Sequence, residues 1–408
     1  MKNNKQPAIR LAGHAGKWKW KKLNEISTKV TEKNKDNLYS ETLTNSAEFG
    51  IVSQRDFFEK DISNVKNLNG YYVVRPDDFV YNPRISNFAP VGPIKRNKLN
   101  RTGVMSPLYY VFRTKEIDNS FLERYFSSKS WHLFMKLNGD SGARSDRFAI
   151  KDVIFGEMPI PFPSIEEQKE IGDFFHKLEE TIILHQQELE MLKQTKQGLL
   201  KKMIPKDGES VPEFRLPDFV SEWKKSQIGE IATIVRGASP RPIQDSKWFD
   251  KESKVGWLRI SDVTKQDGRI HYLEQRISMA GQEKTRVLKE PHLLLSIAAT
   301  VGKPVINYVE TGVHDGFLIF LNPKFDIEFM FQWLEMFRPR WNKYGQPGSQ
   351  VNLNSELVKN QEIYLPDIEE QIQIGNFFKK LDELIALQQQ ELDALKQTKQ
   401  AFLQKIFV

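Results

Sequence analysis

Basic side chains gather in one segment of the chain. Between residues 75 and 113 the sequence holds seven arginines and lysines against two aspartates, with aromatic and turn residues between them. Arginine can donate two parallel hydrogen bonds to guanine, and lysine can neutralise a phosphate. We therefore predict a DNA-binding surface of strands and loops, although a solvated loop on an ordinary barrel is the alternative. The candidate residues are Arg84, Lys95, Arg96, Lys98 and Arg101.

Two glycine-rich turns hold further side chains that could read bases. Residues 139–147 read GDSGARSDR, and residues 344–354 read YGQPGSQVNLN. Arginine suits guanine, whereas glutamine and asparagine suit adenine. The competing interpretation is a loop whose polar groups only cap neighbouring backbone. The candidates from these turns are Arg144, Arg147, Gln346, Gln350 and Asn352, and weaker ones in the second half of the chain are Arg236, Arg241 and Arg259.

No catalytic arrangement of residues is convincing. Asp218 and Glu222 resemble the acids of a metal-dependent nuclease, but three intervening residues are too few to place them on separate strands around one metal. Residues 82–84 (NPR) fall short of the amino-methyltransferase motif Asn/Asp-Pro-Pro-Tyr/Phe. Residues 300–303 (TVGK) lack the upstream glycine of a phosphate-binding loop. We expect neither a catalytic residue, nor a bound cofactor, nor a metal site in this chain.

Composition limits the class of protein. The chain of 408 residues is 39% apolar and 28% charged, which is ordinary for globular domains. A net charge of +7 permits a polyanionic partner without requiring one. The absence of cysteine excludes disulfides and thiolate zinc ligands. No stretch approaches the roughly 18 apolar residues of a membrane helix, and the first residues lack the apolar core of a signal peptide. We expect a cytoplasmic protein without membrane contact.

A long internal repeat positions these candidate residues. Residues 163–205 and 366–408 are identical at 26 of 43 positions without a gap. Shorter matches, such as Arg10 with Arg215 and Trp18 with Trp223, open each half, whereas the middles differ. We expect a mixed α+β protein with a pseudo-twofold repeat, in which each variable domain has a curved sheet that supports reading loops. The predicted boundaries are 1–158 and 206–362 for the two variable domains, and 159–205 and 363–408 for the two helical spacers.

Each repeated segment reads as one long coiled-coil helix. Apolar residues recur at alternating steps of four and three from Ile171 and from Ile374 for more than four heptads. Polar residues interrupt both seams at matching places, and such residues usually fix register. We predict an antiparallel pair within one chain, with one layer joining His185 to Lys399 and the other joining Gln388 to Lys196. The alternative is that each seam packs on another protein or on a second copy.

With this repeat and these helices, the chain resembles the DNA-specificity subunit of a type I restriction-modification system. The resemblance covers the whole length and is most specific in IEEQ followed by I-G-x-F-F, at 165–175 and 368–378, and in the two LKQTKQ runs. It implies two target-recognition domains that select a split, asymmetric site on double-stranded DNA. It also implies two methyltransferase subunits that modify adenine with S-adenosylmethionine, and restriction subunits that use ATP and Mg²⁺. The helices would serve as spacer and docking surface.

Two other classes of protein are also compatible with the sequence. A structural adaptor would use the coiled coil to join two protein partners, and its DNA binding would be weak and independent of sequence. An enzyme with unrecognised motifs would turn over DNA without added subunits. A true reader instead keeps its sequence preference while it loses affinity with salt, because phosphate contacts release counterions.

Overall fold

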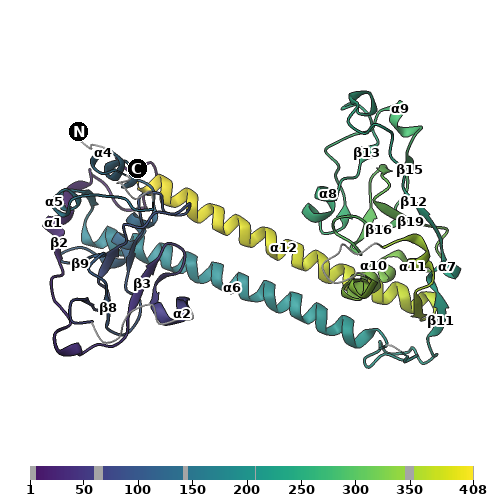
Figure 1. Ribbon diagram of the computed structural model, residues 1–408, viewed down its shortest axis with the longest axis horizontal. Helices are drawn as coiled ribbons and strands as arrows, with labels where there is room; N and C mark the ends of the chain where they lie inside the picture. The colour runs from purple at the N-terminus through teal and green to yellow at the C-terminus, as the bar shows by residue number, and fades with distance from the viewer. Residues whose placement is uncertain (1–5, 59–67, 141–145, 207, 345–352, 408) are drawn as a thin grey trace. The chain divides into compact units, whose positions relative to one another are not determined.

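The structure is a computed structural model of the chain, and it describes residues 6–58, 68–140, 146–206, 208–344 and 353–407. The chain divides into two compact units, which are described separately. The first unit comprises residues 1–186 and 391–408, and the second comprises residues 187–390. Figure 1 labels many of the elements of both units. Both units combine short strands with helices, as expected for a mixed α+β fold.

The first unit is built on a four-stranded antiparallel sheet. β9 (Tyr110–Thr114) lies between two neighbours, so that Phe112 faces Lys29 on one side and Phe79 on the other. The rings of Phe79 and Phe112 stack with their centroids 5.4 Å apart, and both are fully buried. The other strands of this sheet are β2 (Ser27–Lys29), β6 (Phe79–Tyr81) and β7 (Ile94–Arg96). Three two-stranded pairs complete the unit: β1 (Lys19–Lys22) with β10 (Pro159–Phe162), β3 (Leu43–Ser46) with β4 (Gly50–Ser53), and β5 (Tyr72–Val74) with β8 (Gly103–Met105).

The core of the first unit joins this sheet to helices. Asp118 caps α3 (Asn119–Ser127), where its Oδ1 accepts a hydrogen bond from the Phe121 amide. The buried face of α3 packs with Trp18 and with the end of the last helix, where Phe407 lies 5.4 Å from the Phe121 ring. The remaining helices are α1 (Leu23–Ile26), η1 (Lys35–Asn37), α2 (Gln54–Phe58), α4 (His132–Asn138) and α5 (Asp152–Gly156).

The second unit has a larger sheet. Its strand order is β12-β19-β16-β17-β14, antiparallel except between β17 and β14. These strands are β12 (Thr233–Arg236), β14 (Arg269–Ile270), β16 (Leu293–Ser296), β17 (Pro304–Asn307) and β19 (Phe317–Leu321). A three-stranded sheet contains β13 (Gly256–Trp257), β15 (Arg286–Leu288) and β18 (Thr311–Val313), and β11 (Lys224–Gln227) pairs with β20 (Glu362–Leu365).

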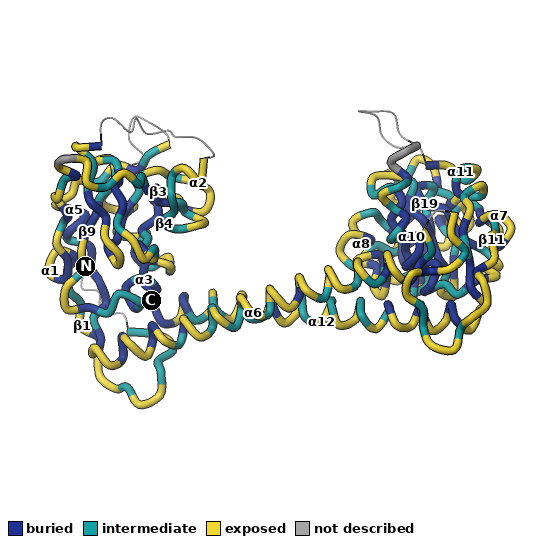
Figure 2. Tube along the Cα trace, turned by 90° about the horizontal axis from the view of Figure 1, so that it is seen from below, coloured by how far each residue is buried: buried dark blue, intermediate teal, exposed yellow. Residues whose placement is uncertain are grey.

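One apolar helix fills the core of the second unit. α10 (Ile327–Phe337) begins at Asp326, whose Oδ1 accepts a hydrogen bond from the Phe329 amide. Eight of its eleven residues are buried, and much of its trace is dark blue in Figure 2. The other helices are α7 (Ile228–Ile231), η3 (Ser246–Trp248), α8 (Ile260–Lys265), α9 (Met279–Gln282), η4 (Arg338–Tyr344) and α11 (Ser355–Lys359).

The two long helices begin in the same way. α6 (Ile165–Met203) follows β10, and α12 (Ile368–Ile406) follows β20. In the first unit the buried carboxylate of Glu167 accepts two hydrogen bonds of 2.7 Å from Arg10. In the second unit Glu370 accepts bonds of 2.8 and 2.7 Å from Arg215. The repeated arginine at the entry of each half is therefore bound by the second glutamate of the IEEQ motif.

The glutamine of the IEEQ motif accepts a hydrogen bond from the backbone at the start of a helix in the same unit. Gln168 Oε1 accepts a hydrogen bond of 2.9 Å from the Asp118 amide at the start of α3. Gln371 Oε1 accepts one of 3.0 Å from the Asp326 amide at the start of α10. The glycine four residues later permits this approach, because a Cβ atom on Gly375 would lie 2.5 Å from Asp326 Oδ1. The repeated motif thus attaches α3 and α10 to the long helices.

The ion pairs between α6 and α12 show that the two helices run antiparallel. In the first unit Lys399 Nζ lies 2.6 Å from Glu179 Oε1, and His185 lies 3.8 Å from Glu391. In the second unit Lys196 pairs with Asp382, and Gln388 donates to Glu188 at 2.8 Å. The residue number on α12 falls as the number on α6 rises, within each unit. The fold class and the antiparallel arrangement are confirmed.

The predicted pairing of the polar layers is wrong. Lys399 pairs with Glu179 rather than with His185, and Lys196 pairs with Asp382 rather than with Gln388. The reason is electrostatic: a largely buried ammonium needs a counterion, and an imidazole or an amide has no negative charge to supply. Glu179 and Asp382 are equivalent in the repeat and lie just outside the apolar seam that the sequence pattern identifies.

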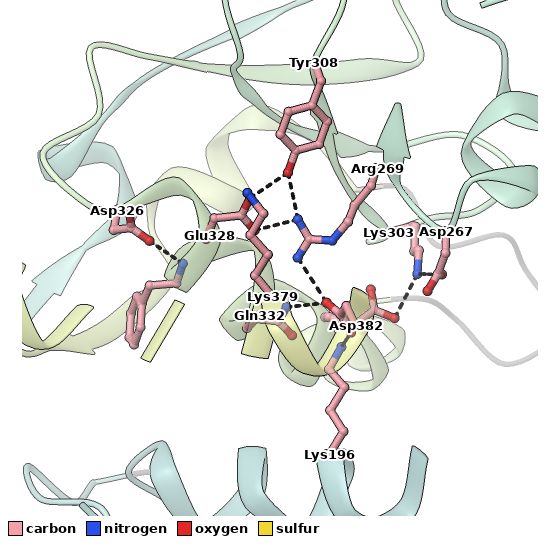
Figure 3. A network of polar contacts seen from close by, with 12 residues as sticks. Lys196, Asp267, Arg269, Lys303, Tyr308, Asp326, Glu328, Gln332, Lys379 and Asp382 are labelled. Carbon is pink, nitrogen blue, oxygen red and sulfur yellow. Dashed lines mark hydrogen bonds and ion pairs between the residues drawn. The ribbon is translucent and has the colours of Figure 1, made fainter. Parts of the chain in front are cut away.

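Each of these lysine–carboxylate pairs also receives an arginine from the strand-rich part of its unit. Arg124 on α3 donates to both oxygens of Glu179. Arg269 on β14 donates to Asp382 at 3.0 Å and to Glu328 at 2.6 Å, as Figure 3 shows. Both arginines are mostly buried. The helix pair and the strand-rich part of each unit therefore share one ion cluster.

The predicted domain boundaries stay a prediction. β10 falls inside the first predicted helical spacer, and β20 begins one residue before the second, yet each pairs with a strand near the start of its own half of the chain. Among the residues that the structure describes, no helix is both long enough and apolar enough to cross a membrane.

Candidate nucleic-acid interface

Two predicted reading segments of the first unit lie side by side. After β6 the chain turns at Asn82, whose Oδ1 accepts a hydrogen bond from the Arg84 amide and whose Nδ2 donates to the Asn45 carbonyl. Arg84 then forms an isolated antiparallel bridge with Arg147, the last residue of the first glycine-rich turn. The structure therefore brings together two arginines that are 63 positions apart in the sequence.

Of these two arginines, Arg84 is the more exposed. The Arg84 side chain is 70% exposed, and its Nε lies 4.0 Å from Asp146 Oδ2, the limit of an ion pair. Arg147 is partly exposed. Exposed charges at such a distance contribute little to stability, so a phosphate or base can replace the carboxylate at small cost. Arg144 lies outside the described residues.

The other predicted cations of the first unit already have intramolecular partners. Arg96 and Lys98 lie 2.7 and 3.2 Å from the same carboxylate, that of Glu123 on α3. Arg101 donates two hydrogen bonds, of 2.7 and 2.8 Å, to Glu41. Contact with DNA would require these pairs to share or release their carboxylates. The surface from residue 75 to 113 is thus less positive than its composition predicts.

Lys95 lies between the sheet and α3. It is the central residue of β7 and is only partly exposed. Burial lowers the pKa of Lys95, and the nearby Glu123 carboxylate acts in the opposite direction. Its position, rather than its charge alone, makes Lys95 a weaker candidate than Arg84.

In the second unit, two of the predicted arginines converge on one loop. Arg236 at the end of β12 donates to the Asp315 carbonyl at 2.6 Å. Arg241 donates to Asp315 Oδ2 at 2.7 Å, and the Arg241 side chain is 71% exposed. Gly237 permits the approach, because a Cβ atom there would lie 2.1 Å from the His314 carbonyl oxygen. The loops after β12 and after β18 therefore form one surface.

Arg286 also belongs to this surface, although it is not among the residues predicted from the sequence. Its Nε donates to the Arg236 carbonyl at 2.8 Å from the start of β15. Arg286 lies 50 positions from Arg236, and no motif surrounds it. Only the pairing of β15 with β18 brings it to the loops. The sequence offers no signal that could have identified it.

Neighbouring groups set the charges on this surface. A hydrogen bond from Ser239 and the charge of Arg241 hold the pKa of Asp315 below its ordinary value, so the carboxylate is ionised at neutral pH. Burial lowers the pKa of His314 against the effect of Asp315, so the imidazole is neutral there. Arg241 donates to the Asp315 carboxylate, whereas Arg236 and Arg286 donate to backbone carbonyls. The three arginines and this one carboxylate together have a net positive charge.

The remaining predicted residues of the second unit do not join this cluster. Arg259 donates two hydrogen bonds to Asp262 and one to Glu274, at the start of α8. The hydrogen bond with Asp262 raises the pKa of Arg259. Gln346, Gln350 and Asn352 lie outside the described residues. In the described parts of the chain, no group of three or more histidine, aspartate or glutamate residues could hold a metal ion.

Comparison with known proteins identifies a family for both halves. The sequence profile described as "Type I restriction modification DNA specificity domain" matches residues 15–194 and again residues 220–397. The chain is 27% identical over 271 residues to the specificity subunit of the type I restriction enzyme MjaVIII from Methanocaldococcus jannaschii. That alignment spans 60% of this chain and 60% of the relative, which is less than two thirds of its length.

Solved structures share the fold. One is a chain from a structural study of complex assembly and conformational transition of the type I R-M system. It superimposes with a TM-score of 0.59 at 17% sequence identity, and the alignment covers 96% of this chain and 97% of that chain. The other is the S subunit of a type I restriction-modification system from M. genitalium, with a TM-score of 0.59 at 14% identity over 99% of both chains.

Proposed function

The chain belongs to the family of type I restriction modification DNA specificity domains, and from this premise we propose that it selects the DNA target of a type I restriction-modification complex. Each unit then binds one half of a split target. Because the two arginine clusters differ in sequence and in supporting strands, the two half-sites differ as well. The target is therefore bipartite and asymmetric.

One observation supports this proposal above the others. The family domain occurs twice, and each copy combines the same attachment to the long helices with its own cluster of exposed or partly exposed arginines. In the first unit the cluster is Arg84 with Arg147, and in the second it is Arg236, Arg241 and Arg286. A common support with different reading surfaces suits a protein that recognises two unlike sequences.

The chemistry of the complex belongs to other subunits in this proposal. Two methyltransferase subunits modify adenine with S-adenosylmethionine, and restriction subunits use ATP and Mg²⁺ to translocate and cut the DNA. The chain itself positions these partners on double-stranded DNA and performs no reaction. We place its action in the cytoplasm, where the DNA and the methyl donor are available.

Mapping of adenine methylation across the host genome tests the proposal. The genome is sequenced by a method that detects methyladenine, in cells with the gene, without it, and with the gene restored. We expect methylation at one split, asymmetric motif to disappear on deletion and to return on restoration. Unchanged methylation in cells that express active methyltransferase subunits would contradict the proposal.

A further inference from the structure

An aromatic ring stands at the tip of a tight turn in the first unit. Phe88 is 79% exposed, more than any other phenylalanine among the exposed large apolar residues. It lies in the two-residue turn between Ser86 and Ala89, whose amides and carbonyls form two reciprocal hydrogen bonds of 3.1 Å. The turn directs a large apolar group into solvent, where water disfavours it.

Hydrogen bonds and buried neighbours hold the base of this turn in place. Ser86 Oγ accepts a third hydrogen bond, of 3.2 Å, from the Ala89 amide. Ala89 is 6% exposed, and Val91 is fully buried. Gly92 has a φ of +81°, and a Cβ atom there would lie 2.2 Å from the Asn82 carbonyl oxygen. These contacts hold the base of the turn against the core, so the ring cannot be withdrawn without rearranging buried residues.

Two arginines lie near the base of this turn. Arg84 comes four positions before Phe88 and is 70% exposed, and Arg147 lies across the isolated bridge from Arg84. Surface arginines attract the phosphates of a duplex, and an apolar wedge beside them can enter a base step. The combination of ring and cations therefore fits a nucleic acid.

A protein partner is a poorer match for the same feature. One aromatic side chain buries at most about 250 Å², whereas a stable protein interface needs roughly 1,000 Å² or more. The residues beside Phe88 in the turn, Ser86 and Asn87, are polar and exposed. The turn offers a single apolar group rather than an apolar face.

We propose that Phe88 inserts into a base step of the duplex bound by the first unit and partly unstacks it, while Arg84 and Arg147 hold the flanking phosphates. The inference rests on the proposed function and adds to it a site of DNA deformation. Pyrimidine–purine steps unstack at the lowest cost. The first half-site therefore contains such a step at a fixed position, even though no hydrogen bond reads it.

The test begins with the purified full-length chain and a pool of duplexes with randomised sequence. Rounds of binding and sequencing yield a duplex that the chain prefers. This duplex is then synthesised with 2-aminopurine, an adenine analogue whose fluorescence rises when it is unstacked, in place of each adenine of either strand in turn. The wild-type chain is compared with Phe88→Ala, with Phe88→Trp, which retains a wedge, and with Phe49→Ala, which removes another exposed ring from the same unit.

We expect fluorescence to rise several-fold at one pyrimidine–purine step with the wild-type chain, with Phe88→Trp and with Phe49→Ala. Phe88→Ala should abolish the rise and weaken binding by about tenfold, as loss of one base–aromatic stack does. Circular dichroism of each variant checks that the fold is retained.

Three results are distinct from this expectation. A preferred duplex without any local rise in fluorescence would overturn the inference and leave the proposed function intact. The inference would also be overturned, with the proposed function intact, if Phe88→Ala raised the fluorescence as much as the wild-type chain does. This includes the case in which the Phe88→Ala substitution weakens only the binding of a protein subunit. If no duplex is enriched from the pool, the proposed function itself fails, and the inference fails with it.

Discussion

Glu167 and Glu370 are carboxylates with almost no exposed surface, and each is paired with one arginine. Glu167 also accepts a hydrogen bond of 3.1 Å from Trp18 Nε1. Glu370 is fully buried and accepts both of its ion-pair hydrogen bonds from Arg215. A buried ion pair adds little net stability, but removal of one partner leaves an uncompensated charge. The second glutamate of the repeated motif is therefore intolerant of substitution, although it has no part in DNA contact.

This role of Glu370 can be tested by a neutral, nearly isosteric substitution. Glu370→Gln should lower the free energy of unfolding by about 3 kcal/mol, because Arg215 loses its counterion. Glu369→Gln, which changes the exposed neighbour on the same turn, should have almost no effect. Thermal unfolding of both variants measures the difference, and equal midpoints would contradict the assignment.

Two glycines on the long helices have opposite surroundings. A methyl group on Gly375 would lie 2.7 Å from the Phe329 amide and would disturb the cap of α10, whereas Gly198 has no atom within 4 Å. Gly375→Ala should destabilise the protein by about 1–3 kcal/mol through overpacking. Gly198→Ala should stabilise it by about 0.5–1 kcal/mol through helix propensity. Thermal midpoints of the two variants should therefore move in opposite directions; shifts of the same sign would refute the close approach at Gly375.

Residue types alone identified part of the candidate interface. Arg84 and Arg147 were both predicted from the chemistry of their segments, but their proximity depends on a bridge that no local pattern encodes. Arg96 and Arg101 were predicted for the same reason, and their ion pairs with Glu123 and Glu41 come from elements distant in the sequence. Local composition reports which cations exist, whereas tertiary contacts determine which of them remain available.

At the scale of elements, the pairing of α6 with α12 depends on charge as much as on apolar packing. Glu179 is at the centre of the cluster in the first unit, with Lys399 on one side and Arg124 on the other. Burial alone would raise the pKa of Glu179, but hydrogen bonds from these two cations outweigh it and hold the pKa below its ordinary value. The ionised carboxylate therefore stabilises this end of the helix pair.

The stabilisation by Glu179 should depend on pH. Because its folded-state pKa is depressed, the contribution is fully present above about pH 4.5 and is lost as the pH falls through the folded-state pKa. At pH 7, Glu179→Gln should cost about 2 kcal/mol, since Arg124 is left buried without its partner. The gap in melting temperature between wild type and variant should be constant from pH 7 to 5 and should narrow below.

The control for this titration is Glu180→Gln on the same helix. Glu180 is exposed and pairs only with His176, at 3.4 Å, so its replacement should change the melting temperature little at any pH. A gap for Glu179→Gln that persists unchanged to pH 3 would mean that the carboxylate does not stabilise the fold through its charge.

The sequence predicted these elements better than their register. A period of 3.5 residues located both long helices, which the structure has at Ile165–Met203 and Ile368–Ile406. The layers were misassigned because only seam positions were compared, and the deciding carboxylates, Glu179 and Asp382, flank the seam. The short strands were not predictable individually, since two to five residues carry too little periodic signal.

At the scale of the molecule, each unit has its own core, its own attachment to the helices and its own candidate interface. The two main cores have no residue in common: one includes Ile406 from the end of α12, and the other includes Ile374 from near its beginning. Recognition by the two units should therefore be separable.

Exchange of one variable domain tests this separation. Residues 18–158 are replaced by the corresponding segment of another family member, and adenine methylation is mapped in cells that carry the hybrid. One half of the methylated motif should change and the other half should stay the same, because the second unit keeps all of its contacts. A change in both halves would show that the two units read DNA jointly.

The attachment of each variable domain to the long helices constrains few side chains of that domain. Gln168 and Gln371 bind backbone amides, and Gly172 and Gly375 require only that a capped helix start approaches them. Almost any side chains can therefore follow, provided that the chain returns to that point. A single crossover between genes, placed within the repeated segments, would transfer a complete reading surface and leave every attachment intact. Inheritance of a new target then needs recombination alone, without a series of adjusting point mutations.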